Sequence, residues 1–132
     1  MTVVPQVADG GVTLALTPAV AIVRVAQDIG LDVVAELRDA LEQAVLARPL
    51  VVVDLAQVQT IDSTGLGTLV RARNAAHRRH GTLALAAQSR FVQTVLHTMR
   101  LDTVFPAFDS PDEAVAILVE DSSLVQEPSK TA

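Results

Sequence analysis

Hydrophobic and polar positions repeat with two different periods along this chain, and the changes of period predict a succession of strands and helices. Short runs rich in valine and other apolar residues predict strands at 12–17, 20–26, 50–55, 82–87 and 104–108. Elsewhere the apolar positions recur every three or four residues, which predicts helices over 31–47, 64–80, 89–100 and 110–119. After two consecutive strands, helices and strands therefore alternate to the end of the pattern.

This order of elements predicts an α/β fold, because alternating strands and helices require a mostly parallel sheet with right-handed crossovers. Only Pro18-Ala19 separates the first two strands, which indicates a hairpin. Pro106 places the last strand at an edge of the sheet. We expect one domain over residues 12–120, with a mixed, mostly parallel five-stranded sheet, an opening β-hairpin and about four helices. Residues 1–11 are expected to be a flexible lead-in, and residues 121–132 a disordered polar tail.

The most informative segment runs from residue 50 to residue 67. Its valine-rich start predicts a strand that is buried on both faces, and Asp62 or Ser63 is placed to cap the helix that follows. The unpaired N–H groups and the dipole at a helix N-terminus favour an anion. A phosphate on Ser63 would therefore be tolerated electrostatically. The alternative is that Asp62 and Ser63 only cap the helix.

Composition limits the classes of function. The 132 residues suffice for one domain with a substantial core, and half of them are hydrophobic. A net charge of −5 argues against direct contact with nucleic acid, and the absence of cysteine excludes disulfides, thiolate catalysis and cysteine-ligated metals. No stretch of 18 apolar residues is free of charge, so no membrane-spanning segment or membrane contact is expected. We therefore expect a cytoplasmic protein.

Motifs for catalysis or nucleotide binding are weak. A hydrolase nucleophile elbow requires glycine two positions before the serine, but Ile61 stands there. None of the three histidines has a spacing that places it beside Ser63 as a base, or that completes a metal site. Gly65-Leu66-Gly67 lacks the lysine and the longer glycine spacing of a phosphate-binding loop. We expect no catalytic residue, metal or cofactor, and interpret these glycines as allowing close approach of another backbone, from the fold or from a partner.

Basic side chains gather on and just beyond the helix that Ser63 opens. They form either a docking patch for an acidic partner or a solvated helix face whose cations lie toward the C-terminus, where the helix dipole favours them. The residues are Arg71, Arg73, His77, Arg78, Arg79 and His80.

The motif Ile61-Asp62-Ser63-Thr64-Gly65-Leu66-Gly67 resembles the STAS domain of the anti-sigma factor antagonists, and the resemblance extends from about Val12 to Val119. It implies a non-enzymatic protein-binding switch. Ser63 would be phosphorylated, with Mg-ATP, by a partner that is both an anti-sigma factor and a serine kinase. The unphosphorylated protein would bind that partner and release the sigma factor, and a serine phosphatase would reset the cycle.

The resemblance also implies a set of partner-binding residues around Ser63. The family commonly has an acidic residue at the position of Gly30, while in this chain Asp28 remains and Asp32 follows. This departure favours an alternative, a constitutive STAS scaffold or regulatory interaction module in a larger signalling assembly that is not switched by phosphorylation. The oligomeric state is left open. The full set of implied contact residues is Asp28, Asp32, Asp62, Ser63, Thr64, Gly65, Leu66 and Gly67.

Overall fold

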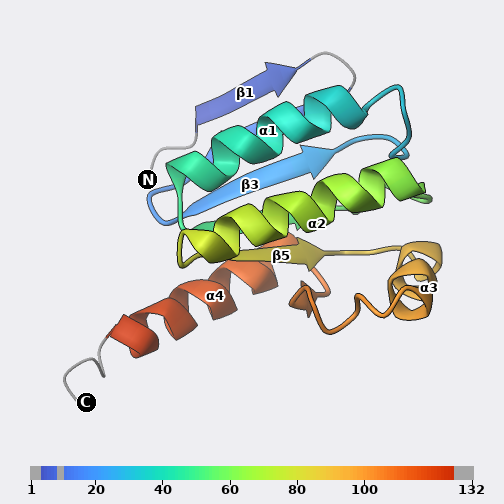
Figure 1. The fold of residues 1–132 in the computed structure, drawn as a ribbon. Helices are drawn as coiled ribbons and strands as arrows, with labels where there is room; N and C mark the ends of the chain where they lie inside the picture. The colour runs from blue at the N-terminus through green and yellow to red at the C-terminus, as the bar shows by residue number, and fades with distance from the viewer. Residues whose placement is uncertain (1–3, 9–10, 127–132) are drawn as a thin grey trace.

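In the computed structural model, the described residues are 4–8 and 11–126, and they form a six-stranded mixed sheet with helices on both faces (Figure 1). The strands lie side by side in the order of the chain. Strands β1 to β3 pair antiparallel, and β3 to β6 pair parallel. The strands are β1 (Val4–Ala8), β2 (Val12–Leu16), β3 (Val20–Val25), β4 (Leu50–Asp54), β5 (Thr82–Ala86) and β6 (Ala107–Phe108). The helices are α1 (Val34–Ala47), α2 (Ser63–Arg78), α3 (Arg90–Thr98) and α4 (Pro111–Gln126).

The predicted fold class, with its five strands, opening hairpin and four helices, is confirmed, and β1 is a sixth strand. The expectation of a flexible lead-in over residues 1–11 is wrong for residues 4–8, which pair antiparallel with β2. Pro5 lies in this strand opposite Ala15. A proline is accepted there because β1 is an edge strand, where a backbone N–H is not needed on the outer side. Residues 1–3 and 9–10 lie outside the described part.

The last elements differ from the prediction in length. Helix α4 continues to Gln126, so the expected tail begins later than residue 121; residues 127–132 lie outside the described part. Strand β6 is limited to Ala107–Phe108, because the chain turns before it: the Val104 N–H donates to the Leu101 carbonyl over 3.0 Å. In that turn Phe105 is buried in the core instead of extending the strand.

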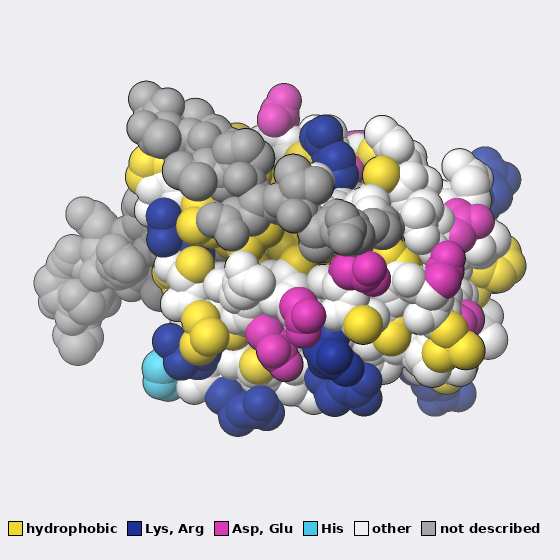
Figure 2. Space-filling model, turned by 90° about the horizontal axis from the view of Figure 1, so that it is seen from above, with side chains coloured by type: hydrophobic (Ala, Val, Ile, Leu, Met, Phe, Trp, Pro, Cys, Tyr) yellow, Lys and Arg dark blue, Asp and Glu magenta, His cyan; other side chains and the backbone are white. Residues whose placement is uncertain are grey.

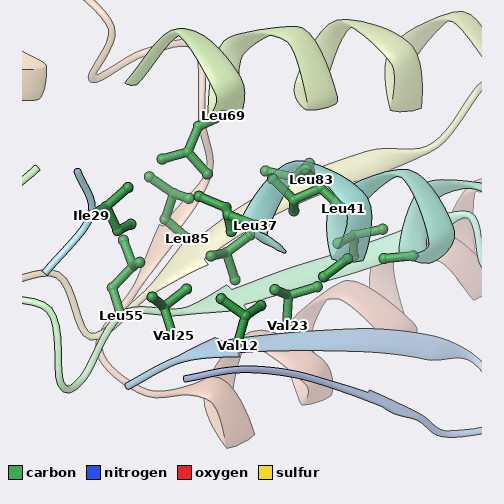
Figure 3. Close-up of a cluster of buried hydrophobic side chains, with 14 of the residues drawn as sticks. Val12, Val23, Val25, Ile29, Leu37, Leu41, Leu55, Leu69, Leu83 and Leu85 are labelled. Carbon is green, nitrogen blue, oxygen red and sulfur yellow. The ribbon is translucent and has the colours of Figure 1, made fainter. Parts of the chain in front are cut away.

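Two apolar layers hold the sheet between the helices. Helices α1 and α2 cover one face, where Leu37, Leu41 and Leu69 lie among inward-facing residues of the strands (Figure 3). Helix α4 covers the other face through Ala114 and Leu118. All five residues of β4 are buried, which confirms the prediction of a strand buried on both faces. The central strand is thus fixed from both sides.

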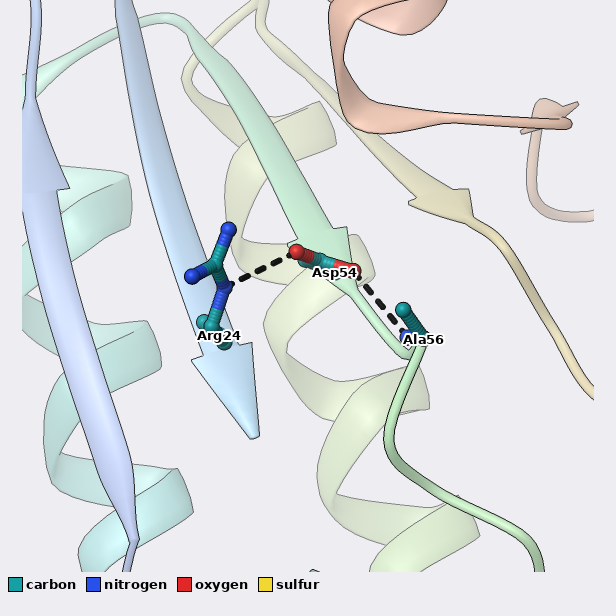
Figure 4. Close-up of polar contacts among 3 residues, drawn as sticks. All are labelled: Arg24, Asp54 and Ala56. Carbon is teal, nitrogen blue, oxygen red and sulfur yellow. Dashed lines mark hydrogen bonds and ion pairs between the residues drawn. The ribbon is translucent and has the colours of Figure 1, made fainter. Parts of the chain in front are cut away.

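A buried carboxylate fixes the end of that central strand. Asp54 is 3% exposed and accepts a hydrogen bond from Arg24 Nε over 3.0 Å; Arg24 is its register partner on β3. Its second oxygen accepts the backbone N–H of Ala56, also over 3.0 Å (Figure 4). The pair therefore joins the carboxyl ends of β3 and β4 and holds the first turn of the connection that leads to α2.

Candidate functional site

The loops that follow β3 and β4 meet at the carboxyl ends of these strands, and α2 begins beside them. Ile29, which follows β3, forms an isolated parallel bridge with Ile61, which precedes α2. The Ile29 N–H donates to the Thr60 carbonyl over 3.1 Å, and the Asp62 N–H donates to the Ile29 carbonyl over 3.0 Å. These bonds bring residues 27–32 next to the start of α2, about thirty residues away along the chain.

Asp28 ties the same two connections together through its side chain. Its Oδ1 accepts the backbone N–H of Gln59 over 2.8 Å and that of Thr60 over 3.2 Å. These two N–H groups lower the pKa of Asp28 below its ordinary value. The carboxylate of Asp28 therefore stabilises the turn before α2. Its contact with a partner stays a prediction.

We expect Asp28→Asn to lower stability at neutral pH and to have a smaller effect in acid. The folded-state pKa of Asp28 is depressed, so its stabilising contribution is present above the unfolded value of about 3.9 and is lost as pH falls through the lower folded value. Urea unfolding of both proteins at pH 7 and near pH 3 measures the difference. Glu42→Gln, an exposed carboxylate on α1, is the matched control. A deficit of Asp28→Asn that is equal at both pH values would contradict this role.

The structure decides which residue caps α2. Asp62 is the N-cap, since its Oδ1 accepts the Gly65 N–H over 2.9 Å and the Thr64 hydroxyl over 2.7 Å. These two donors, the Gly65 N–H first, lower the pKa of Asp62. Ser63 is the first residue of the helix, and its side chain is exposed, as are those of Asp62 and Thr64. The hydroxyl of Ser63 is therefore presented to solvent at the positive end of the helix dipole.

Gly65 and Leu66 lie beneath this surface. Both are buried, whereas Gly67 is half-buried. A Cβ at Gly65 would lie 2.3 Å from Ile29 Cγ2 and 3.0 Å from Ile61 Cγ1. Gly65 and Leu66 thus pack the helix onto the loops, and the expected contact of Gly65, Leu66 and Gly67 with a partner stays a prediction. The close approach at Gly65 is made by the side chains of Ile29 and Ile61, and not by another backbone as expected.

A shallow hollow of about 500 Å³ lies beside the start of α2. An added Cβ at Gly30 would lie 3.5 Å from Asp62 Oδ2 and 3.6 Å from Asp32 Oδ1. Position 30, where the resemblance implies an acidic residue, thus lies between two carboxylates that are already present. Among the side chains that the structure describes, no three His, Asp or Glu form a group that would hold a metal ion. The hollow is lined by Gln27, Asp28, Ile29, Gly30, Asp32, Thr60 and Asp62.

Five of the basic residues singled out in the sequence border three different hollows. Arg71 and Arg78 border a groove between α2 and α1. Arg73 and His77 border a separate hollow beside residues 102–107, and Arg79 borders a third where α1 meets β4. In Figure 2, basic side chains gather along the lower border, which is the side of the sheet covered by α1 and α2.

Comparison with known proteins gives a consistent result. Residues 12–109 match the model of a family described as "Mlab, STAS domain". Among solved structures, a STAS domain protein described as an anti-sigma-factor antagonist from Planctomyces limnophilus has a TM-score of 0.75 and 23% identity over 83% of this chain and 98% of that one. An anti-sigma factor antagonist from Mycobacterium paratuberculosis has a TM-score of 0.68 and 24% identity over 89% and 92%.

A sulfate transporter family protein from Wolinella succinogenes also matches, with a TM-score of 0.70 and 22% identity over 80% of this chain and 91% of that one. At these identities the likeness to solved structures shows the fold. The described helices include none with the length and apolar character needed to cross a membrane.

Proposed function

The chain belongs to the STAS domain family, and on that basis we propose that it is an anti-sigma factor antagonist switched by phosphorylation of Ser63. In its unphosphorylated form it binds an anti-sigma factor that is also a serine kinase, and thereby releases the sigma factor. The kinase phosphorylates Ser63 with Mg-ATP, and a serine phosphatase restores binding. The protein itself catalyses no reaction in this cycle and needs no cofactor of its own.

The exposure of Ser63 at the first position of α2 is the observation that carries this proposal. A kinase must reach the acceptor hydroxyl, and here the neighbouring side chains Asp62 and Thr64 are exposed as well. The cap hydrogen bonds are made by Asp62, so the Ser63 hydroxyl is not needed to hold the helix. Modification of Ser63 therefore leaves the cap in place.

The same geometry explains how a phosphate would act as a switch. Phosphoserine adds nearly two negative charges, which the N-terminus of α2 accommodates. The first turn is held by the buried Gly65 and Leu66, so the fold of the antagonist stays unchanged. A partner surface packed against Ser63 would have to desolvate these charges beside the carboxylates of Asp62 and Asp32. The added charge therefore acts on the complex and leaves the free protein unchanged.

Phosphorylation by the cognate kinase is expected to occur on Ser63 and not on Thr64. The purified protein is incubated with that kinase and Mg-ATP, and the modified peptide is mapped by mass spectrometry. Ser63→Ala should abolish incorporation, while Thr64→Ala, which changes the adjacent exposed hydroxyl, should retain it. Phosphate on another residue, or none after incubation with a kinase that binds the protein, would contradict the proposal.

A constitutive STAS interaction module is the second candidate. Gly30 favours it, because the acidic residue common at this position is replaced by a residue without a side chain. The likeness to a sulfate transporter family protein from Wolinella succinogenes is consistent with such a role. Concentration-dependent self-association, together with partner binding that is unaffected by Ser63→Asp, would favour this candidate over the switch.

A further inference from the structure

A groove runs between α1 and α2 along the outer side of the helical layer, away from Ser63. Its floor includes Leu41, which is 1% exposed, and two small residues of α2, Ala72 and Ala75, which are half-buried. Because these alanine side chains are short, they do not fill the space between the two helices, and a hollow of about 370 Å³ remains there. At one end Leu46 is 66% exposed, which leaves a large apolar side chain in water at the margin of the groove.

The rim of the groove is positively charged in a protein whose net charge is −5. Arg38 stands on the α1 side, and Arg71 and Arg78 stand on the α2 side. On the α1 side the charges are mixed, because Arg38 Nε lies 3.7 Å from Asp39 Oδ1 and Glu42 shares the rim. On the α2 side Arg71 and Arg78 favour an occupant with negative charges along the flank of its apolar stripe that faces α2.

The dimensions of the groove suit a helix. The lining residues span positions 38–46 of α1 and 68–78 of α2, a length of about 12–15 Å at 1.5 Å per residue. A groove of this form accepts one face of a helix through apolar residues spaced three, four and seven positions apart. A small molecule would be incompletely enclosed here, because the margin at Leu46 is open to water.

The geometry points to a second docking surface on this domain: the α1–α2 groove binds an acidic amphipathic helix of a partner protein. The apolar stripe of that helix lies on Leu46, Ala72 and Ala75, and the carboxylates along one flank of it pair with Arg71 and Arg78. The surface begins more than a turn beyond Ser63 and runs away from it. Binding in the groove is therefore independent of the proposed phosphorylation switch.

The test uses the full chain and a fluorescein-labelled peptide of sixteen residues, with leucines at helical spacing and glutamates along one flank of the leucine stripe. We expect binding by fluorescence anisotropy, and amide shifts of ¹⁵N-labelled protein confined to the residues that line the groove. The double variant Arg71→Glu/Arg78→Glu should weaken binding at least tenfold. A matched control, Arg73→Glu/Arg79→Glu, makes the same charge change on and next to the same helix outside the groove, and should weaken binding less than threefold.

Two further variants separate the groove from the general charge of the surface and from the switch. Ala72→Gln fills the floor without changing charge and should also weaken binding, while thermal unfolding shows whether the variant is folded. Ser63→Asp should leave the affinity for the peptide unchanged. The groove and the phosphorylation switch can therefore be tested separately, and a negative result for one does not decide the other. A version of the peptide with a central proline should bind more weakly.

Several results would overturn this inference. Equal losses in the two arginine double variants would show diffuse electrostatic attraction, and amide shifts centred on Ser63 would place the peptide elsewhere. Binding to vesicles containing anionic lipid, with none to the peptide, would make the surface a membrane contact. Concentration-dependent dimerisation that shifts the groove residues would assign the groove to a second copy of the chain.

Discussion

Replacing Ser63 with aspartate is expected to weaken binding to the anti-sigma factor kinase by about a hundredfold, while the free protein keeps its stability. A hundredfold loss corresponds to roughly 3 kcal/mol. The aspartate places a charge at an exposed position that the proposed complex would cover, next to the carboxylate of Asp62. In the free protein the same charge lies at the N-terminus of α2, where the helix dipole favours it.

Titration calorimetry of the two purified proteins measures this loss. Ser63→Ala should bind within a few-fold of the unmodified protein, because it removes only a hydroxyl that is not part of the cap. Asn74→Asp is the matched control for charge, since it adds a carboxylate to an exposed position of the same helix, about three turns from Ser63. Equal weakening by Ser63→Asp and Asn74→Asp would show that net charge, and not the site, governs the affinity.

The second large effect concerns the two glycines of the motif, which lie in the same helix and are expected to respond in opposite directions. Gly65→Ala should destabilise the protein by about 2 kcal/mol, because its Cβ would overlap the buried side chain of Ile29 at 2.3 Å. Ile29 is branched at Cβ and is 2% exposed, so it has little freedom to move aside. Gly67→Ala should instead stabilise by about 0.5–1 kcal/mol, since its Cβ meets only Arg71 Nη1 at 3.6 Å.

Urea denaturation of the two variants and the unmodified protein, at one pH and temperature, measures this contrast. Each variant adds one methyl group to the first turns of α2, so each controls for the gain in helix propensity of the other. Stability changes of the same sign and similar size would show that Gly65 is not tightly packed. Because Ile29 belongs to the connection held by Asp28, Gly65→Ala should also weaken partner binding.

The fold was predictable because its determinants are local. The valine-rich strand at 50–55 and the change to helical period after Ser63 both follow from side-chain periodicity within a few residues. Strand β1 was missed because Pro5 and Gln6 do not follow a strand pattern; its pairing comes from β2, and an edge position tolerates proline. The end of α4 was placed early because the polar residues after Glu120 were interpreted as a tail.

For the candidate site, the sequence predicts the helix N-terminus at which it lies, but not the hydrogen bonds that its residues make. The Asp62-Ser63 sequence predicts a helix N-terminus, but only the structure shows that Asp62 is the N-cap and that Ser63 is the first residue of the helix. Asp28 was identified as an acidic residue near Ser63, whereas its bonds to Gln59 and Thr60 depend on a loop packing that no local pattern encodes. Leu66 is likewise buried in the apolar cluster that holds Ile29 and Ile61, which lie in loops that no helical or strand period predicts.

The direction of the strands also decides where other polypeptides can be joined to this domain. Strand β1 starts at the same end of the sheet as β3 and β4, because Val4 pairs with Leu16, Leu16 with Ala21 and Ala21 with Val51. Helix α4 runs back toward that end of the sheet, which is opposite α3 (Figure 1). The first residue of β1 and the last described turn of α4 therefore both lie at the end of the domain opposite Ser63, so a fluorescent reporter placed on either of these elements would stand clear of the proposed partner surface.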